Sequence, residues 1–94
     1  MSAITRLGDL TTGHGCFPPM PSITASTNVF CNGIGVVRVS DVYTGHCCGP
    51  ACHGGVLAAG SSTVFVNGRA LGRIGDLVSC GDHVGQGSSN SFCG

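Results

Sequence analysis

A five-residue phrase occurs three times in this chain of 94 residues, and it constrains the fold more than any other feature. The copies are residues 6–10 (RLGDL), 38–42 (RVSDV) and 73–77 (RIGDL). They contain three of the four arginines and three of the four aspartates, so most of the charge belongs to one repeated local structure. Because regular self-similarity is typical of repeat architectures, we predict a fold with internal threefold pseudo-symmetry.

A second motif precedes the repeated phrase. Residues 26–33 (STNVFCNG) and 61–68 (SSTVFVNG) stand at the same distance before the second and third copies. A shortened version, residues 88–94 (SSNSFCG), closes the sequence, whereas the first copy has no leader. The repeat is therefore permuted, and its two ends could complete one unit. We expect the N-terminal and C-terminal segments to lie close together.

Each leader predicts a β-hairpin. Residues 63–66 are β-branched or aromatic, Asn67-Gly68 suits a type I′ turn, and residues 69–74 can return as the second strand. The dipeptide Asn32-Gly33 marks an equivalent hairpin.

The repeated phrase itself has the chemistry of a turn. Its Gly-Asp or Ser-Asp pair frees the backbone and offers a carboxylate to nearby backbone amides. We interpret the three aspartates as structural: Asp9, Asp41 and Asp76. An arginine stands three residues before each aspartate, where an exposed ion pair would contribute little.

The composition predicts one small domain, residues 1–94, that burial alone stabilises poorly. Hydrophobic residues make up 41% of the chain, but seven residues are cysteines and 17 are glycines, and tryptophan is absent. A core of this size gives only a few kcal/mol of stability. We expect another interaction to hold the chain together.

The charge balance excludes several functions. The chain has no lysine and a formal net charge of zero, so it lacks the basic surface that nucleic-acid binding requires. It has neither a long apolar span nor a signal peptide, so we expect synthesis in the cytoplasm or export by a route that needs no signal. Only 9% of the residues are charged, which favours a partner that covers part of the surface.

The cysteines and histidines favour a metal site over a disulfide framework, because the cysteine count of seven is odd and no secretory signal is visible. His14 and His46 each lie five residues after a repeated aspartate, and Cys80 lies four residues after the third. Equivalent loops would bring these three groups to one axis. A tetrahedral site needs a fourth ligand.

His53, within the loop of residues 45–55, is the candidate for the fourth ligand. The spacing leaves five competitors open: Cys16, Cys47, Cys48, Cys52 and His83. For the cysteines outside the metal site, we expect small apolar core residues.

In their combined order these motifs resemble the PAAR-repeat family. The resemblance covers essentially the whole chain and includes residues 46–54 (HCCGPACHG). The tetrad that names the family aligns with residues 35–38 (GVVR) and 70–73 (ALGR), and its arginine is the residue that both segments retain. Ser40 replaces the usual glycine of the second Gly-Asp pair. The resemblance implies an all-β, conical, pseudo-threefold fold of short hairpins and glycine-rich loops with a zinc at the apex.

The resemblance also implies a site and a function. Family members hold one structural zinc ion with three histidines and one cysteine, a set that maps onto His14, His46, His53 and Cys80. They cap the trimeric β-helical spike of contractile injection machines, in phage tails or type VI secretion systems. A closed four-ligand site leaves no position for a reactive water, so we expect neither catalytic residues nor a small-molecule substrate.

The expected role is mechanical. One chain would sit base-down on each trimeric spike, with its edge strands extending those of the partner. The point would lead into the target envelope, in transient contact with its membrane, after delivery outside the producing cell as part of a virion or secretion apparatus. We expect a tip without a toxin domain of its own.

Two other classes remain open. One is an enzyme with a reactive cysteine, pairing Cys80 with His83 or Cys52 with His53. The other is a small disulfide-stapled or metal-binding interaction module unrelated to a spike. Thiol counting separates zinc from disulfides: near seven free thiols favours zinc, and near one favours three disulfides.

Overall fold

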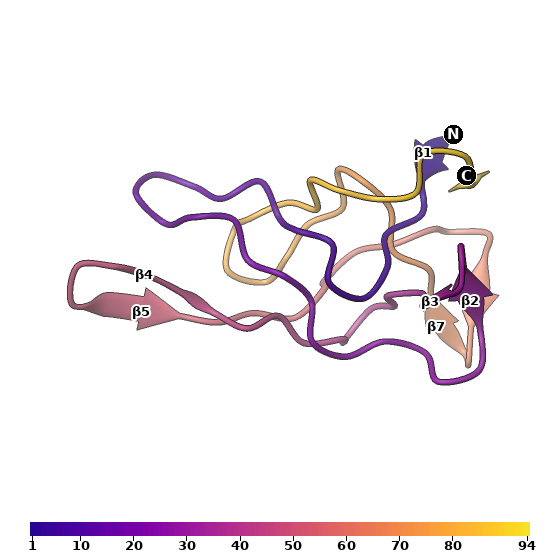
Figure 1. The fold of residues 1–94 in the computed structure, drawn as a ribbon, viewed down its shortest axis with the longest axis horizontal. Coiled ribbons are helices and arrows are strands. Elements are labelled where there is room, and N and C mark those ends of the chain that lie inside the picture. Colours follow the sequence, from indigo (N-terminus) through magenta and orange to yellow (C-terminus); the bar gives the residue numbers. More distant parts are fainter.

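A computed structural model describes residues 1–94 and shows an all-β chain, as predicted. Its eight short strands are β1 (Ser2–Ala3), β2 (Phe30–Cys31), β3 (Ile34–Gly35), β4 (His46–Cys48), β5 (Ala51–His53), β6 (Phe65–Val66), β7 (Arg69–Ala70) and β8 (Phe92–Cys93). They form four antiparallel pairs: β1–β8, β2–β3, β4–β5 and β6–β7 (Figure 1). The structure holds no helix with the length and hydropathy needed to cross a membrane.

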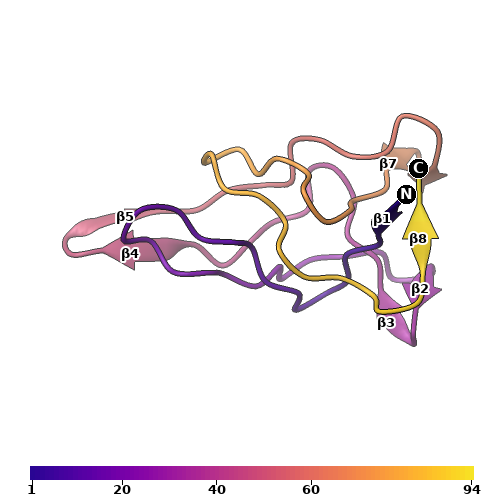
Figure 2. The ribbon, with the colours of Figure 1, turned by 90° about the horizontal axis from the view of Figure 1, so that it is seen from above.

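The four strand pairs divide between the two ends of an elongated molecule. Three pairs, β1–β8, β2–β3 and β6–β7, gather at one end, which we call the base, and the β4–β5 hairpin projects at the other (Figures 1 and 2). The chain measures 37 × 23 × 22 Å along its principal axes. We call the β4–β5 hairpin and the neighbouring loop of residues 12–19 the apex.

The two ends of the chain form the third hairpin of the base. β1 pairs with β8 in antiparallel register, with Ser2 opposite Cys93 and Ala3 opposite Phe92. This pairing confirms that the permuted repeat is completed by its own termini.

Two hairpins of the base, β2–β3 and β6–β7, have strands joined by a short turn, and both turns have the predicted type. Both central residues of each turn have positive φ, 56° and 76° at Asn32-Gly33 and 54° and 76° at Asn67-Gly68, as a type I′ turn requires. The hairpins are shorter than predicted, because the chain leaves them to join a neighbouring unit. After β7 ends, Leu71 bridges to Arg38 of the preceding unit.

A closed ring of three backbone hydrogen bonds joins the units around the pseudo-threefold axis. Thr5 N–H donates to Gly72 O (3.2 Å), Val37 N–H to Thr5 O (3.1 Å) and Gly72 N–H to Val37 O (2.8 Å). Each of these residues immediately precedes the arginine of a repeated phrase. A Cβ atom at residue 72 would lie 2.6 Å from Leu57 Cδ2 and 3.0 Å from Val37 O, so the ring requires glycine there.

The core has two parts. One cluster, between base and apex, consists of Met20, Val37, Tyr43, Leu57, Val78 and Val84. The other lies under the base and includes the residue after the phenylalanine of each unit: Cys31, Val66 and Cys93. Cys31 and Cys93 are thus apolar core residues, as predicted.

Each repeated phrase closes a turn through its arginine and aspartate. The backbone N–H of the arginine donates to aspartate Oδ2 at 2.8 Å in all three copies, and the guanidinium binds the same carboxylate. These ion pairs are more buried than expected, since Asp41 and Asp76 have little solvent exposure. Burial alone would raise the pKa of Asp41, but hydrogen bonds from Arg38 and Thr24 outweigh it and hold that pKa below its usual value.

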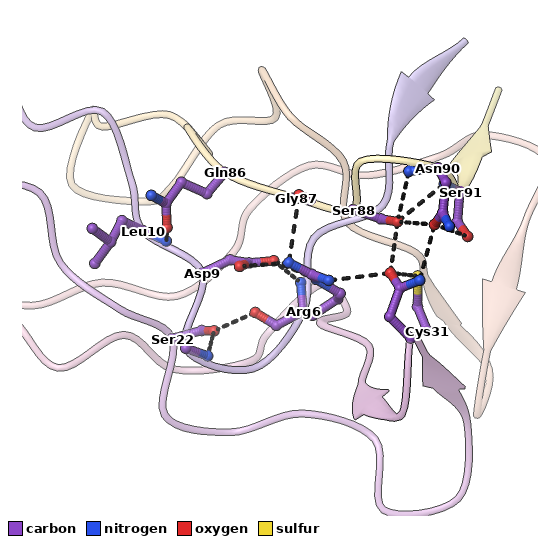
Figure 3. A network of polar contacts seen from close by, with 12 residues as sticks. Arg6, Asp9, Leu10, Ser22, Cys31, Gln86, Gly87, Ser88, Asn90 and Ser91 are labelled. Atoms are coloured by element: carbon purple, nitrogen blue, oxygen red, sulfur yellow. Dashed lines mark hydrogen bonds and ion pairs between the residues drawn. The ribbon is translucent and has the colours of Figure 1, made fainter.

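The arginines also connect the units. Arg6 Nη1 donates to Asn32 Oδ1 (3.1 Å), which accepts the Ser88 hydroxyl (2.6 Å). Figure 3 shows Arg6 between Asp9 on one side and Cys31 and Ser88 on the other. Arg38 and Asn67 repeat the first contact at 2.9 Å. In the first two units the phrase is therefore a turn that is attached to the hairpin of the next unit, whereas Arg73 of the third unit donates to the carbonyl oxygen of Gly60 (3.3 Å).

Ser40 adopts the backbone conformation of the glycine that it replaces. Its φ is 81°, against 87° at Gly8 and 92° at Gly75 in the equivalent positions. The turn geometry is thus preserved at a position where an L-residue is strained.

Candidate metal centre

Four side chains predicted as ligands meet at the apex. One ligand atom from each of His14, His46, His53 and Cys80 lies within 4.8 Å of the others. His46 and His53 come from β4 and β5, His14 from the loop of residues 12–19, and Cys80 from the turn after the third repeated phrase. Segments far apart in the sequence therefore converge on one point.

The two strand histidines face each other across the β4–β5 hairpin. They are directly opposed in the strand register, and their Nε2 atoms are 2.7 Å apart. His46 Nδ1 is 2.7 Å from the carbonyl oxygen of Pro18, which can only accept, so Nδ1 carries the proton and Nε2 has a free lone pair. Two imidazole nitrogens this close need a proton or a cation between them.

His14 is held by a tight turn. Its N–H donates to Phe17 O (3.1 Å), and Phe17 N–H donates back to His14 O (2.8 Å). Gly13 has a φ of 75°, and a Cβ there would lie 2.7 Å from Phe17 O. His14 Nδ1 is buried without a hydrogen-bond partner, 3.9 Å from Asp82 Oδ1.

Asp82 is a fully buried carboxylate beside the site. Burial would raise its pKa, but hydrogen bonds from Thr11, Thr12 and the His83 backbone, together with the nearby His14, keep that pKa below its usual value. The charge that it keeps at neutral pH favours a cation at the centre.

Cys80 sits in a turn at the edge of the core. Gly81 has a φ of 97°, and its N–H donates to Val78 O (2.9 Å). The Cys80 side chain packs against the central core cluster and remains a free thiol. This turn brings the thiol to the histidines.

Phe17 covers the histidines, a role that we did not predict. Its ring centroid lies 5.0, 4.9 and 4.2 Å from those of His14, His46 and His53. The only available signal was its position three residues after a candidate ligand. An apolar ring here limits the access of water to the site.

The donor set fits a zinc ion. Tetrahedral zinc with Zn–N of about 2.0–2.1 Å and Zn–S of about 2.3 Å separates its donors by roughly 3.3–3.6 Å. The donors here range from 2.7 Å apart, between the Nε2 atoms of His46 and His53, to at most 4.8 Å apart, a range that includes those separations. Burial first, and then the neighbouring His46 and His14, lower the pKa of His53, which favours the neutral imidazole that metal binding needs. The unpaired nitrogen of His14 and the opposed Nε2 atoms are the features that an ion would satisfy.

The other candidate ligands are placed elsewhere or bonded otherwise. His83 is exposed and lies outside the group of four. Disulfides join Cys16 to Cys48 and Cys47 to Cys52, which removes all four from the set of available thiolates.

The prediction that these four cysteines are apolar core residues is wrong. The apex segments 12–19 and 47–56 contain no buried residue, so no core exists there for a cysteine to join. The disulfides and the candidate metal ligands, which we treated as alternatives, lie side by side in the same part of the fold.

Comparison with known proteins places this chain in one family. The PAAR motif matches residues 8–86. The NAD(P)(+) glycohydrolase toxin Tse6 and the (p)ppApp synthetase toxin Tas1, both from Pseudomonas aeruginosa, are each 35% identical over 78 residues, or 77% of this chain and 18% of the toxin. The double-stranded DNA deaminase toxin A of Burkholderia cenocepacia is 31% identical over 70 residues, which is 74% of this chain and 5% of the toxin.

The chain belongs to the PAAR-repeat family, as the sequence resemblance predicted. It spans less than a fifth of the length of the curated relatives that it matches.

Proposed function

We propose that this protein is the zinc-stabilised tip of a contractile injection machine and that it caps a trimeric spike with one chain per trimer. Family membership supports the association with a spike. The matched relatives are bacterial toxins, which favours a type VI secretion system over a phage tail and delivery outside the producing cell.

Three equivalent phenylalanines at the base carry the proposal. Phe30, Phe65 and Phe92 occupy the same position in the three units and are 59%, 61% and 51% exposed. The next residue of each strand points inward to the base core cluster, so the phenylalanines point outward by strand alternation. Large aromatic side chains rarely stay exposed in this way unless a partner covers them.

The symmetry of this surface supports a trimeric partner. Three equivalent anchors around one axis match a partner with three equivalent binding sites, as the blunt end of a homotrimer offers. The short strands of the base could also extend the strands of that partner and cover its open edges.

The apex would act as the leading point. We assign zinc to His14, His46, His53 and Cys80, where it replaces the core that the apex lacks. Structural zinc contributes about 10–16 kcal/mol of apparent binding free energy in small peptides, enough to decide whether the apex is ordered. Residues 12–19 and 46–56 contain no Asp, Glu, Lys or Arg, which lowers the desolvation cost of transient contact with a membrane.

A catalytic role has little support. Cys52, one of the two thiols considered as nucleophiles, is bonded to Cys47, and the other, Cys80, lies in the proposed zinc site. We therefore propose a structural function, and we do not extend the activities of the toxin relatives to this chain.

Binding to the cognate trimeric spike tests the proposal. Native mass spectrometry should find one chain per trimer. Substitution of Phe30, Phe65 or Phe92 by Ser should each weaken binding by about 2 kcal/mol, or about thirtyfold, if they are interface anchors. Leu77→Ser is the matched control, because Leu77 is 42% exposed and bridges to His83, away from the base.

Three outcomes would contradict the proposal: three chains per trimer, no binding to a folded spike, or equal losses from Leu77→Ser and the phenylalanine variants.

A further inference from the structure

Four of the seven cysteines lie together at the apex and have no part in the proposed zinc site. Disulfides join Cys16 to Cys48 and Cys47 to Cys52, with Cα–Cα distances of 5.4 and 4.1 Å. The remaining cysteines are free thiols: Cys31, Cys80 and Cys93. The bonded cysteines thus all lie at the apex, whereas two of the free ones, Cys31 and Cys93, lie in the base.

Both disulfides lie next to histidines of the metal centre. Cys16 follows His14 by two residues, and Cys48 follows His46 by two residues, so their bond ties the loop of one ligand to the strand of another.

The second disulfide crosses the β4–β5 hairpin. Cys47 and Cys52 form the register pair immediately beyond His46 and His53. Their bond therefore fixes the separation of the two strands at the position where those histidines face each other. Together the two bonds join all three histidine-bearing segments, and they leave the segment of Cys80 free.

Most of the apex cysteines are accessible to an oxidant in solvent, and no hydrophobic core surrounds them. Cys16, Cys47 and Cys52 are exposed, whereas Cys31 and Cys93 are buried in the base. Apart from His46, the apex segments contain no buried residue, so hydrogen bonds, the disulfides and the proposed metal ion hold them together in place of a core. Oxidation should therefore be selective for the apex.

We propose that these four cysteines form a redox clasp, which closes on oxidation and slows the loss of the metal ion from the three histidines. Each bond forms when two cysteine thiols react with one small disulfide such as oxidised glutathione, which leaves as two thiols and carries away both hydrogens. The clasp rests on the proposed zinc site but not on docking to a spike. Closed, it holds the histidines in place, so that their dissociation from the ion becomes slower.

The clasp has a functional consequence. Thiols stay reduced in the cytosol and become oxidised in the periplasm or outside the cell. A chain that crosses from one to the other would therefore keep its metal more firmly after export than before it.

Thiol counting and zinc release test the clasp on the full chain. The chain is reduced, loaded with one equivalent of zinc, and then incubated with or without oxidised glutathione. Alkylation in denaturant should count seven thiols before oxidation and three after it, as the two bonds require. Peptide mapping should find Cys16 with Cys48 and Cys47 with Cys52. Transfer of zinc to a chromogenic chelator should be about tenfold slower or more from the oxidised chain.

Variants separate the clasp from a general effect of oxidation. The double variant Cys16→Ser/Cys48→Ser should lose most of the difference in release rate between oxidised and reduced chains. Cys31→Val is the matched control, because the equivalent residue of the next unit is Val66, and it should keep the whole difference.

Several results would overturn the clasp. They are seven thiols after oxidation, bonds that include Cys80, or equal release rates from the two forms. Binding of a second zinc ion by the reduced chain, lost on oxidation, would also overturn it, because the four thiols would then be metal ligands. A chain that binds no zinc would overturn both the clasp and the metal centre, whereas failure to bind a spike affects neither.

Discussion

Replacing Ser40 by glycine should stabilise the protein. Ser40 holds a φ of 81°, where the two other units use glycine at 87° and 92°. A left-handed conformation costs an L-residue roughly 1–2 kcal/mol, and replacement by glycine removes this cost. Glycine also makes the unfolded chain more flexible, which offsets about 0.4–1 kcal/mol of the gain in stability. The expected net gain is about 1 kcal/mol, which corresponds to a rise in Tm of about 4–8 °C for a domain of this size.

The reverse substitution provides the control. Gly75 occupies the equivalent position in the third unit, and a Cβ there would meet no atom within 4 Å. Gly75→Ser should therefore destabilise the protein by about the same amount, through backbone conformation alone.

Denaturant unfolding, followed by the fluorescence of Tyr43, measures both variants. Tyr43 is the only tyrosine, tryptophan is absent, and the tyrosine side chain is buried in the central core. Zinc and the redox state must be the same for all samples, since each changes the apparent stability. A loss of stability in Ser40→Gly, or changes of the same sign in both variants, would refute the argument from φ.

Two further predictions concern the axis and the apex. Gly72→Ala should lower the free energy of unfolding by more than about 2 kcal/mol in denaturant experiments, because the new Cβ would lie 2.6 Å from Leu57 Cδ2 beside the hydrogen-bond ring. A neutral surface change costs less than about 0.5 kcal/mol. A loss as small as that would show that the ring can shift. His46→Ala and Cys80→Ala should each abolish the single equivalent of zinc measured by elemental analysis, whereas His83→Ala should retain it. Acidification should release the ion, because metal ligands must be deprotonated to bind it. Retention of zinc by either ligand variant would show that the assignment is wrong.

The sequence predicted the parts of the fold that depend on local chemistry. Asn-Gly turns, the equivalence of the three units and the meeting of the chain ends all follow from residue types at fixed spacing. The four residues that group at the apex were each named in advance, because three of them recur after equivalent aspartates. Their role as zinc ligands stays a prediction.

Other features depend on which surfaces meet in three dimensions. The ring through Thr5, Val37 and Gly72 joins residues from three units, and a single sequence contains no sign of that contact. The same holds for the four cysteines of the apex. Their pairing depends on how far the β4–β5 hairpin projects beyond the core, which local patterns do not encode. The position of Phe17 was not predicted either, because its contacts with the histidines are made across the apex.

The pairing of β1 with β8 affects how the chain reaches its native state. Two of the three hairpins of the base close through tight turns and can form as soon as their own residues are available. The third joins Ser2–Ala3 to Phe92–Cys93, so it closes a loop of nearly the whole chain. Long-range pairing of this kind is slow, because the entropy of loop closure must be lost before contacts compensate for it. During synthesis, the last side of the base therefore stays open until the ribosome has released residues 92 and 93.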